Sequence, residues 1–304
     1  MDILGIGNAL LDIFGFSDED LALSLGLHPN RGTHVSPERL DELLLAVPNP
    51  IFVSGGTAAN ALKASAALGL DCAFVGCIGT EDREDDRWAR LFTADLSDAR
   101  VEAILERRTI PTGRCLVIHM PGSMKSIACS PGAAPKINPE QITAQLISKA
   151  RQVFVDGQIL RNPDVFGKVD RLCLDAGVPL AVDVASTDIA RDKSAVIGRL
   201  LAESGATVFL NEDEARALAS ALEGTVPSDL SGLSPDARCD AIFSHCVQAG
   251  SGAGADTKAG KATIVVKLGE RGVRCWSAEG KTEIAAKAVD HPLDDTGAGD
   301  TFAG

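Results

Sequence analysis

Pro179-Leu180-Ala181-Val182-Asp183-Val184, with Val153-Phe154-Val155 before it and Thr207-Val208-Phe209-Leu210 after it, decides the fold of this 304-residue chain. These apolar runs predict buried strands. Helical patterns lie between and around them, over 138–150, 162–176, 192–204 and 212–222. Strands and helices that alternate in this way predict a parallel sheet with helices on both faces. We therefore predict an α/β fold with a large parallel-sheet domain.

Several predicted strands are followed at their C-terminal ends by residues that could bind a ligand. Asn8, Gly55-Gly56 and Asn211 all occupy such positions, and Asp12 follows Asn8 closely. Asn60 lies one turn into an alanine-rich helix that begins after the glycine pair. Ligands of parallel sheets bind at the carboxyl ends of the strands. The shared position of these residues predicts a binding site there.

Each of these residues also has an ordinary structural interpretation. Asp12 can be a loop carboxylate, and Gly55-Gly56 can form a tight turn between a strand and a helix. Asn211 can be a helix N-cap, with Glu212-Asp213-Glu214 as acids in the first helical turn. The alternative for Asn211 and its acids is a polar cluster that positions a hydrated Mg²⁺ ion on a nucleotide.

The sequence Asp294-Asp295-Thr296-Gly297-Ala298-Gly299-Asp300 carries the chemistry of a phosphate site. Glycine has no side chain to block the approach of an anion to backbone N–H groups. A helix that starts here would add unpaired donors and the positive end of its dipole. Asp300 could then take the proton of a hydroxyl that attacks a phosphate. A plain glycine-containing turn before a helix would give the same pattern.

The middle and the end of the chain differ from the alternating part. Predicted strands over 101–105, 114–119 and 126–129 follow one another, which suggests a separate small sheet or lid. The charged run 81–87 indicates a solvated helix start. Residues 223–261 are weakly patterned around one helix, 235–248. Further on, a strand over 263–268 leads into a loop with Gly269 and Gly272, which suits nucleotide phosphates or a hairpin turn.

Composition excludes several classes of protein. Acidic residues outnumber Lys plus Arg by 42 to 29, a net charge of −13, which argues against nucleic acid as a partner. No run reaches the roughly 18 apolar residues of a membrane span. The eight cysteines form no Cys-x-x-Cys pair, and the N-terminus has no basic signal region. We therefore expect a cytoplasmic protein with reduced thiols, no structural zinc and no membrane partner.

Two nucleotide-binding motifs are present only as fragments. Gly5-x-Gly7 would begin a dinucleotide fingerprint, but Leu10 stands at the third glycine position. Gly260-Lys261 resembles part of a P-loop, but Ala262 replaces the metal-binding hydroxyl. A P-loop kinase is excluded, and a nicotinamide-dependent dehydrogenase is only a distant alternative.

Taken together, the motifs resemble the ribokinase-like, or PfkB, family of carbohydrate kinases. The matching motifs span nearly the whole chain: Gly5-Ile6-Gly7-Asn8, Asp12, Gly55-Gly56, Asn60, Gly76-x-Ile78-Gly79, Thr112-Gly113, Asn211-x-x-Glu214, Lys267-Leu268-Gly269-x-x-Gly272 and Asp294–Asp300. Within the family, the stretches most similar to the adenosine kinases are 7–12, 25–30, 74–79 and 111–115.

The resemblance implies a role for each matching position. Asp300 would be the general base, and Gly297, Ala298 and Gly299 would form the anion hole. The residues implied in substrate binding are Asn8, Asp12, Gly55, Gly56 and Asn60. Those implied in binding ATP are Asn211, Lys267, Gly269 and Gly272. Glu214 would act on Mg²⁺ indirectly, through water.

The implied activity is ATP-dependent phosphorylation of a sugar-type primary alcohol, first of all a nucleoside, with adenosine converted to AMP. A free-sugar kinase for fructose, ribose or a ketoacid sugar is one alternative, and a non-catalytic nucleoside-binding protein is another. The implied cofactors are ATP and Mg²⁺, and a monovalent cation such as K⁺ is compatible with the family. The protein would be a monomer or a homodimer.

The resemblance also implies a domain organisation. Residues 1–304 would form one Rossmann-like α/β kinase domain, with a small β-sheet lid from about 13–35 and 101–130 inserted in it. The lid would close over the substrate and exclude water. Family members continue beyond the Asp300 motif, so we expect that this chain is truncated after Gly304.

Overall fold

The predicted alternation appears in a computed structural model of the chain. The structure describes residues 1–304 except 30, 82–83, 122–123, 226–229, 253–260 and 290–296, so that Asp294, Asp295 and Thr296 lie outside the described residues. The described chain divides into two compact units, which are considered one at a time. The first comprises residues 1–6 and 142–304, and the second comprises residues 7–141.

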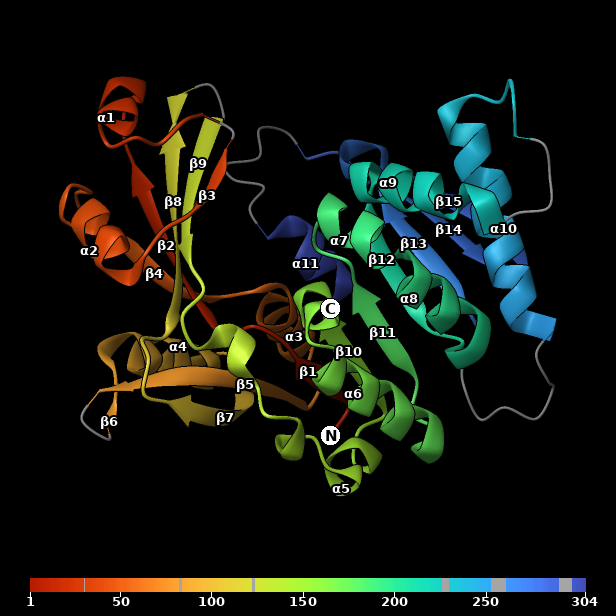
Figure 1. Cartoon of the computed structure of the whole chain (residues 1–304), viewed down its shortest axis with the longest axis horizontal. Coiled ribbons are helices and arrows are strands. Elements are labelled where there is room, and N and C mark those ends of the chain that lie inside the picture. Colours follow the sequence, from red (N-terminus) through yellow and green to blue (C-terminus); the bar gives the residue numbers. More distant parts are fainter. Residues whose placement is uncertain (30, 82–83, 122–123, 226–229, 253–260, 290–296) are drawn as a thin grey trace. The chain divides into compact units, whose positions relative to one another are not determined.

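The first unit is built on a mostly parallel sheet. Its strands, in spatial order, are β1 (Ile3–Ile6), β10 (Gln152–Asp156), β11 (Leu180–Asp183), β12 (Thr207–Asn211), β13 (Thr263–Lys267), β14 (Val273–Ser277) and β15 (Gly280–Ile284). The strands from β1 to β13 are parallel, and β14 and β15 continue the sheet in antiparallel fashion (Figure 1). The predicted parallel-sheet α/β fold is confirmed.

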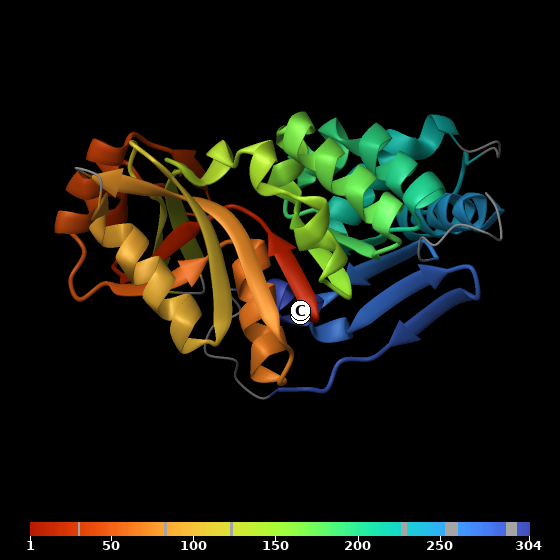
Figure 2. The same ribbon diagram turned by 90° about the horizontal axis from the view of Figure 1, so that it is seen from below.

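Most helices of this unit connect its strands, and the last one follows β15. They are α5 (Ala144–Ser148), α6 (Pro163–Ala176), α7 (Thr187–Asp192), α8 (Ser194–Arg199), α9 (Glu212–Leu222), α10 (Pro235–Gly252) and α11 (Ala298–Ala303). The green-to-teal helices α6 to α9 lie together on one side of the strands (Figure 2).

The described part of the chain contains no helix that is long and apolar enough to cross a membrane.

Local sequence signals set the ends of α6. The Asn162 side chain accepts a hydrogen bond from the Val165 amide, and Pro163 occupies the first helical turn, where no amide donor is needed. Gly177 ends the helix in the left-handed region at φ 66°. The buried face carries Val165 and Val169 among others. The structure therefore reproduces the predicted helix 162–176 almost residue for residue.

Two predicted helices are shorter than expected. Over 138–150, only α5 is α-helical, because Pro139 lies in a short 3₁₀ turn and the Thr143 side chain caps the helix that begins at Ala144. Over 192–204, the chain forms α8 and then a π-helical turn, Leu200–Ser204, which Gly205 ends at φ 60°. Apolar periodicity alone does not mark these interruptions.

The second unit contains two groups of strands. In the first, β5 (Cys72–Glu81) pairs in parallel with β7 (Val101–Arg108) and in antiparallel fashion with β6 (Glu84–Asp85). The second group is a separate sheet with the order β3 (Gly32–His34), β9 (Met124–Ser130), β8 (Gly113–Met120), β2 (Leu10–Phe16), β4 (Ile51–Gly55). Its helices are α1 (Glu19–Ser24), α2 (Pro37–Leu45), α3 (Thr57–Ala67) and α4 (Arg87–Asp98).

The separate sheet differs from the lid that the sequence predicts over about 13–35 and 101–130. Strand β7 lies outside it, because β7 pairs with β5 over its whole length, from Val101 opposite Cys72 to Arg108 opposite Gly79. Strand β4, which the predicted lid does not include, is an edge strand of this sheet. The residues 72–108 thus form their own strand–helix–strand unit with α4 as the connection.

The charged run 81–87 is also different from the predicted solvated helix start. Glu84 and Asp85 form the short strand β6, and the helix begins only at Arg87. Asp86 is the N-cap and is 6% exposed. Its carboxylate accepts hydrogen bonds from the Ala89 amide at 2.6 Å and from the Thr112 amide at 2.7 Å. A carboxylate with this many donors can be buried without a large loss of stability.

Candidate active site

The carboxylate of Asp12 lies against the end of strand β4. Leu10 on β2 is opposite Gly55 on β4, and Asp12 is opposite Val53. A Cβ atom at Gly55 would overlap with the Asp12 carboxylate. Gly55 therefore leaves the space that the carboxylate occupies. This steric requirement for glycine is stricter than that of the tight turn, the alternative interpretation of Gly55-Gly56.

Gly56 connects β4 to helix α3 in a conformation that favours glycine. Its φ is 88°, and a Cβ atom would overlap with the backbone oxygen of Asn8. The backbone N–H of Asn60 donates a hydrogen bond to the backbone oxygen of Gly56 at 3.0 Å, which forms the first turn of α3. Within the second unit, the structure thus brings together all five residues predicted to bind the substrate, at the start of β2, the end of β4 and the start of α3.

Three polar residues end neighbouring strands in the first unit. Asp183, Asn211 and Lys267 are the last residues of β11, β12 and β13, and Asn211 is directly opposite Lys267. The Lys267 ammonium donates a hydrogen bond to Oδ2 of Asp183 at 2.6 Å. It also lies 3.4 Å from the Gly299 carbonyl oxygen in α11. The strand ends therefore place a cation beside the predicted anion hole.

Asn211 and Glu214 form a reciprocal cap at the start of α9. The Glu214 amide donates to the Asn211 side chain at 2.9 Å. In return, the Glu214 carboxylate accepts from the Asn211 amide and from its side-chain nitrogen, both at 2.8 Å. The helix-cap interpretation of this motif is therefore correct. A role of the same carboxylate toward a metal is compatible with the cap.

Burial makes Glu214 and Asp183 unusual carboxylates. Glu214 is 4% exposed and Asp183 is 1% exposed. Burial raises the pKa of both carboxyl groups. The hydrogen bond from the backbone amide of Asn211 lowers the pKa of Glu214, and the positive charge of Lys267 lowers the pKa of Asp183. The negative charge of Asp300 raises the pKa of both groups further. These interactions place Asp300 in the same electrostatic cluster as Lys267.

The glycine turn and the helix predicted around Asp300 are present. Gly297 has φ 75°, in the left-handed region, and α11 begins at Ala298. The Thr301 amide donates to the Gly297 oxygen at 2.8 Å, and Asp300 lies in the first turn. Gly297, Ala298, Gly299 and Asp300 are thus arranged as a turn into a helix, the geometry that favours an anion at backbone N–H groups.

The loop with Gly269 and Gly272 connects the antiparallel strands β13 and β14. Gly272 has φ 98°, and a Cβ atom there would overlap with the backbone oxygen of Ile284 on β15. The Leu268 amide donates to the Gly272 oxygen at 2.8 Å. Gly269, at φ 61°, is exposed and open on its Cβ side. The hairpin-turn interpretation accounts for Gly272, and the Gly272 amide also donates to the Gly269 oxygen at 3.0 Å within the same turn.

Asp183 is a residue of this cluster that the sequence motifs do not select. A signal is present in the sequence, because an acid ends an otherwise apolar strand, Leu180-Ala181-Val182-Asp183. By itself, that position indicates only the end of a strand. Its significance depends on Lys267, which lies two strands away in the sheet and 84 positions away in the sequence.

The described acidic groups do not form a direct metal site. Among the residues that the structure describes, no group of three or more His, Cys, Asp and Glu side chains is arranged to hold a metal ion directly. Mg²⁺ usually keeps several waters and is bound through few carboxylates together with substrate phosphates. The indirect role of the Glu214 carboxylate toward Mg²⁺, through water, stays a prediction.

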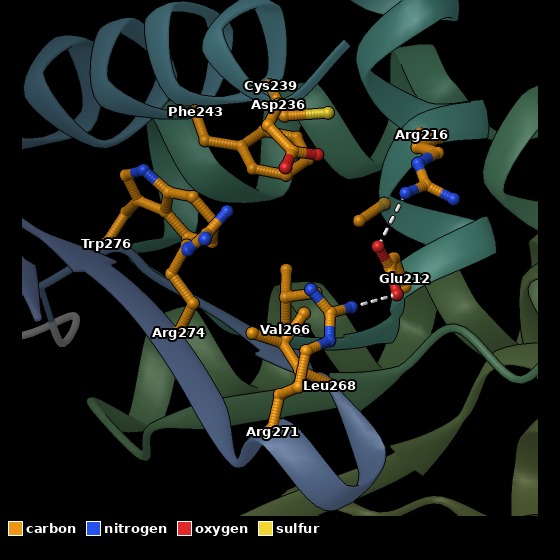
Figure 3. Close-up of a pocket in the computed structure, with 11 residues that line it drawn as sticks. Glu212, Arg216, Asp236, Cys239, Phe243, Val266, Leu268, Arg271, Arg274 and Trp276 are labelled. Atoms are coloured by element: carbon orange, nitrogen blue, oxygen red, sulfur yellow. Dashed lines mark hydrogen bonds and ion pairs between the residues drawn. The ribbon is translucent and has the colours of Figure 1, made fainter. Parts of the chain in front are cut away.

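A separate pocket lies between α9, α10, β13 and β14 (Figure 3). The Glu212 carboxylate sits in its wall and pairs with Arg216 at 2.5 Å and with Arg271. Phe243 and Trp276 form an apolar side of the same pocket. None of the residues that line it is a predicted site residue, so we do not place the reaction there.

The architecture, a mostly parallel α/β sheet with a second small sheet, is that of the ribokinase-like kinases. Residues 23–304 match the pfkB family carbohydrate kinases, and the chain belongs to this family. It is therefore a phosphotransferase whose acceptor is an alcohol group of a sugar or nucleoside. The expected family is confirmed over most of the chain.

Solved structures of low sequence identity share the fold. The adenosine kinase from Sinorhizobium meliloti has a TM-score of 0.78 at 20% identity, covering 99% of this chain and 85% of that one. A probable sugar kinase from Rhizobium etli CFN 42 has a TM-score of 0.79 at 19% identity, covering 99% and 84%. The apo adenosine kinase from Trypanosoma brucei brucei has a TM-score of 0.80 at 18% identity, covering 100% and 90%.

Proposed function

We propose that the protein transfers the γ-phosphoryl group of ATP to the primary hydroxyl of a nucleoside, with adenosine as the first candidate. The observation that carries this proposal is the position of Asp300. It lies in the first turn of α11, directly after the glycine turn and in the electrostatic cluster of Lys267. Donors for the phosphate charge and a base for the hydroxyl are what phosphoryl transfer requires.

In this reaction the hydroxyl oxygen attacks the γ-phosphorus while the bond from that phosphorus to the β–γ bridging oxygen breaks. Asp300 accepts the hydroxyl proton, and ADP leaves with the bridging oxygen. The amides of Gly297, Ala298 and Gly299 would stabilise the charge on the transferred group as an anion hole. A carboxylate is suited to the proton transfer because it needs only to be ionised and within hydrogen-bond reach of the hydroxyl.

The alcohol would be held by the group of residues around Asp12. Its carboxylate can accept hydrogen bonds from two neighbouring hydroxyls, as a sugar ring presents them. Gly55 and Gly56 keep the surrounding backbone free of side chains, and Asn60 and Asn8 add an amide side chain each. Closure of the separate β-sheet as a lid would exclude water from the reaction.

ATP would be bound by Asn211, Lys267, Gly269 and Gly272, with Mg²⁺ ordered through water by Glu214. When bound, Mg²⁺ would neutralise phosphate charge during the transfer. Lys267 would contribute a positive charge beside the proposed anion hole, because its ammonium lies 3.4 Å from the Gly299 carbonyl oxygen. The cytoplasm, where ATP and Mg²⁺ are abundant, is the compartment we propose, with the protein acting as a monomer or homodimer.

A kinase of free sugars such as fructose, ribose or a ketoacid sugar is a second candidate. The observation that favours it is the comparable similarity of the chain to a probable sugar kinase, at a TM-score of 0.79, and to two adenosine kinases, at 0.78 and 0.80. A protein that binds nucleosides without turnover would share the fold as well. It would not need Asp300 or the Asn211–Glu214 pair.

The test is ADP release from Mg-ATP across adenosine, other nucleosides, fructose and ribose, with the Asp300→Asn variant alongside. Asp164→Asn is a matched control, because Asp164 is an exposed acid in the first turn of α6. Turnover of adenosine that Asp300→Asn abolishes and Asp164→Asn leaves intact would support the proposal. Turnover of a free sugar alone would support the second candidate, a free-sugar kinase with the same mechanism. Tight nucleoside binding without any turnover would contradict the kinase.

A further inference from the structure

The Lys267 side chain bridges two parts of the first unit that are distant in sequence. Its ammonium contacts Asp183 at the end of β11 and the Gly299 carbonyl in α11, at 2.6 and 3.4 Å. Its side chain is 14% exposed and that of Asp183 is 2% exposed. An ion pair at this depth is screened little by water, so its geometry is more constrained than that of a surface pair.

Both oxygens of the Asp183 carboxylate have a partner. Oδ2 accepts from Lys267, and Oδ1 accepts from the Ala185 amide at 3.3 Å. Ala185 has φ 65°, which is unusual for a residue other than glycine. The turn that follows β11 thus fixes the direction of the carboxylate, and the carboxylate fixes the ammonium.

The Lys267 side chain lies close to α11 at Gly299. A Cβ atom there would lie 3.4 Å from Nζ of Lys267, in van der Waals contact with it. Lysine carries three N–H donors, and in this structure Asp183 and the Gly299 carbonyl take two. Gly299 immediately precedes Asp300, so the ammonium holds the backbone to which the proposed base is attached.

We infer that Asp183 and Lys267 are a positioning pair, in which the buried carboxylate holds the ammonium against the Gly299 carbonyl and so fixes the first turn of α11 and the direction of Asp300. The inference rests on the proposed function for its effect on catalysis, although the contact itself does not. For Lys267, this inference replaces the direct role in ATP binding that is proposed above, because a positioning pair acts through α11. The sequence motifs assign no role to Asp183.

The experiment uses the full chain with Lys267→Met, Asp183→Asn and the double variant. Lys281→Met is the matched control, because Lys281 lies in the same unit and pairs at 2.9 Å with Asp240 of α10 rather than with α11. Two measurements are made on each protein. One is kcat and KM for ATP and for the alcohol. The other is hydrogen exchange of the Thr301 and Gly304 amides at millisecond to second labelling times, because these amides donate to Gly297 and Asp300 within α11.

The pair predicts one pattern in both measurements. Each single variant lowers kcat by about 100-fold, as a small displacement of a catalytic group can, and leaves KM for ATP within about threefold. The double variant loses no more kcat than the single variants, because either change alone already breaks the contact between the ammonium and the Gly299 carbonyl. Exchange of the Thr301 and Gly304 amides becomes faster in all three and is unchanged in Lys281→Met.

Other results would overturn the inference in distinguishable ways. A rise in KM for ATP with kcat unchanged would make Lys267 an ATP ligand. Losses that add in the double variant would show that the two residues act independently. Unchanged amide exchange would show that they do not hold α11. If the unmodified protein phosphorylates no alcohol, the proposed function fails, and amide exchange alone still decides whether the pair holds the helix.

Discussion

The carboxylate of Asp12 occupies the space that any side chain at Gly55 would need. The two residues belong to neighbouring antiparallel strands, β2 and β4, with Leu10 directly opposite Gly55. The direction of the carboxylate is therefore a property of the strand pairing and of the glycine together. In the proposed function the same carboxylate binds the hydroxyls of the substrate, so a backbone requirement of the fold also shapes the binding site.

Replacement of Gly55 by alanine is expected to weaken alcohol binding more than folding. The added methyl group would displace the end of a flexible side chain rather than backbone, so Asp12 would turn away while the strands stay paired. Loss of a hydrogen bond to a charged group is worth about 1.5–3 kcal/mol, which corresponds to a rise of about 10- to 150-fold in KM for the alcohol. Steady-state kinetics with saturating ATP measures this effect.

Gly167→Ala is the control for that variant. Gly167 lies within α6, and nothing lies within 4 Å of its Cβ position, so alanine is expected to stabilise the helix by about 0.5–1 kcal/mol without changing KM. An unchanged KM in Gly55→Ala, in a protein that turns over normally, would contradict a role of Asp12 in binding the alcohol.

Asn211→Ala is expected to destabilise the protein more than a typical cap substitution. The loss of an N-cap costs about 1 kcal/mol. Here the change also removes the side-chain donor from the buried Glu214 carboxylate, which adds about 1–3 kcal/mol. Asn162→Ala is the matched comparison, because Asn162 caps α6 through a single bond to Val165 at 3.3 Å. Urea denaturation of both variants should show the larger loss for Asn211, and equal losses would contradict the coupling of Asn211 with Glu214.

Much of the fold could be predicted from the sequence because its strongest signals are local. Continuous apolar strands, Asn162 and Pro163 before a helix, and Gly177 after it each specify structure within a few residues. The glycines Gly56 and Gly297 are local signals of the same kind, because their positive φ values of 88° and 75° are properties of their own backbone. These features need no knowledge of distant partners.

The remaining features depend on contacts that are distant in sequence. Strand β7 resembles a lid strand in sequence, and only its pairing with β5 shows where it belongs. Asp86 lies in a charged run, yet it is buried because Thr112 supplies a donor to its carboxylate. Asp183 gains its significance from Lys267. Periodicity contains no information on such partners, so it assigns these residues wrongly or not at all.

The two glycines of the β13–β14 loop are expected to respond differently to alanine. Gly272 has φ 98°, and a Cβ atom would meet the backbone of β15, which cannot move away easily. Gly272→Ala should lower the free energy of unfolding by more than roughly 1–2 kcal/mol, which is the cost of a left-handed backbone for a residue other than glycine. Gly269→Ala should lose about that amount, because its Cβ position is open. Urea denaturation separates the two, and a similar loss in both would contradict the hairpin explanation for Gly272.

The stability of the protein is expected to fall above pH 9, in part because of Cys173. Burial raises the pKa of this thiol from 9.0 to about 12. Between these values the unfolded chain releases the proton and the folded protein keeps it, so rising pH favours unfolding by up to about 1.4 kcal/mol per pH unit. Urea denaturation at pH 8, 9, 10 and 11 measures the slope. Cys173→Ala should be less stable at pH 8 because of the cavity, yet its slope above pH 9 should be smaller by that amount. An unchanged slope would show that the thiol ionises alike in both states.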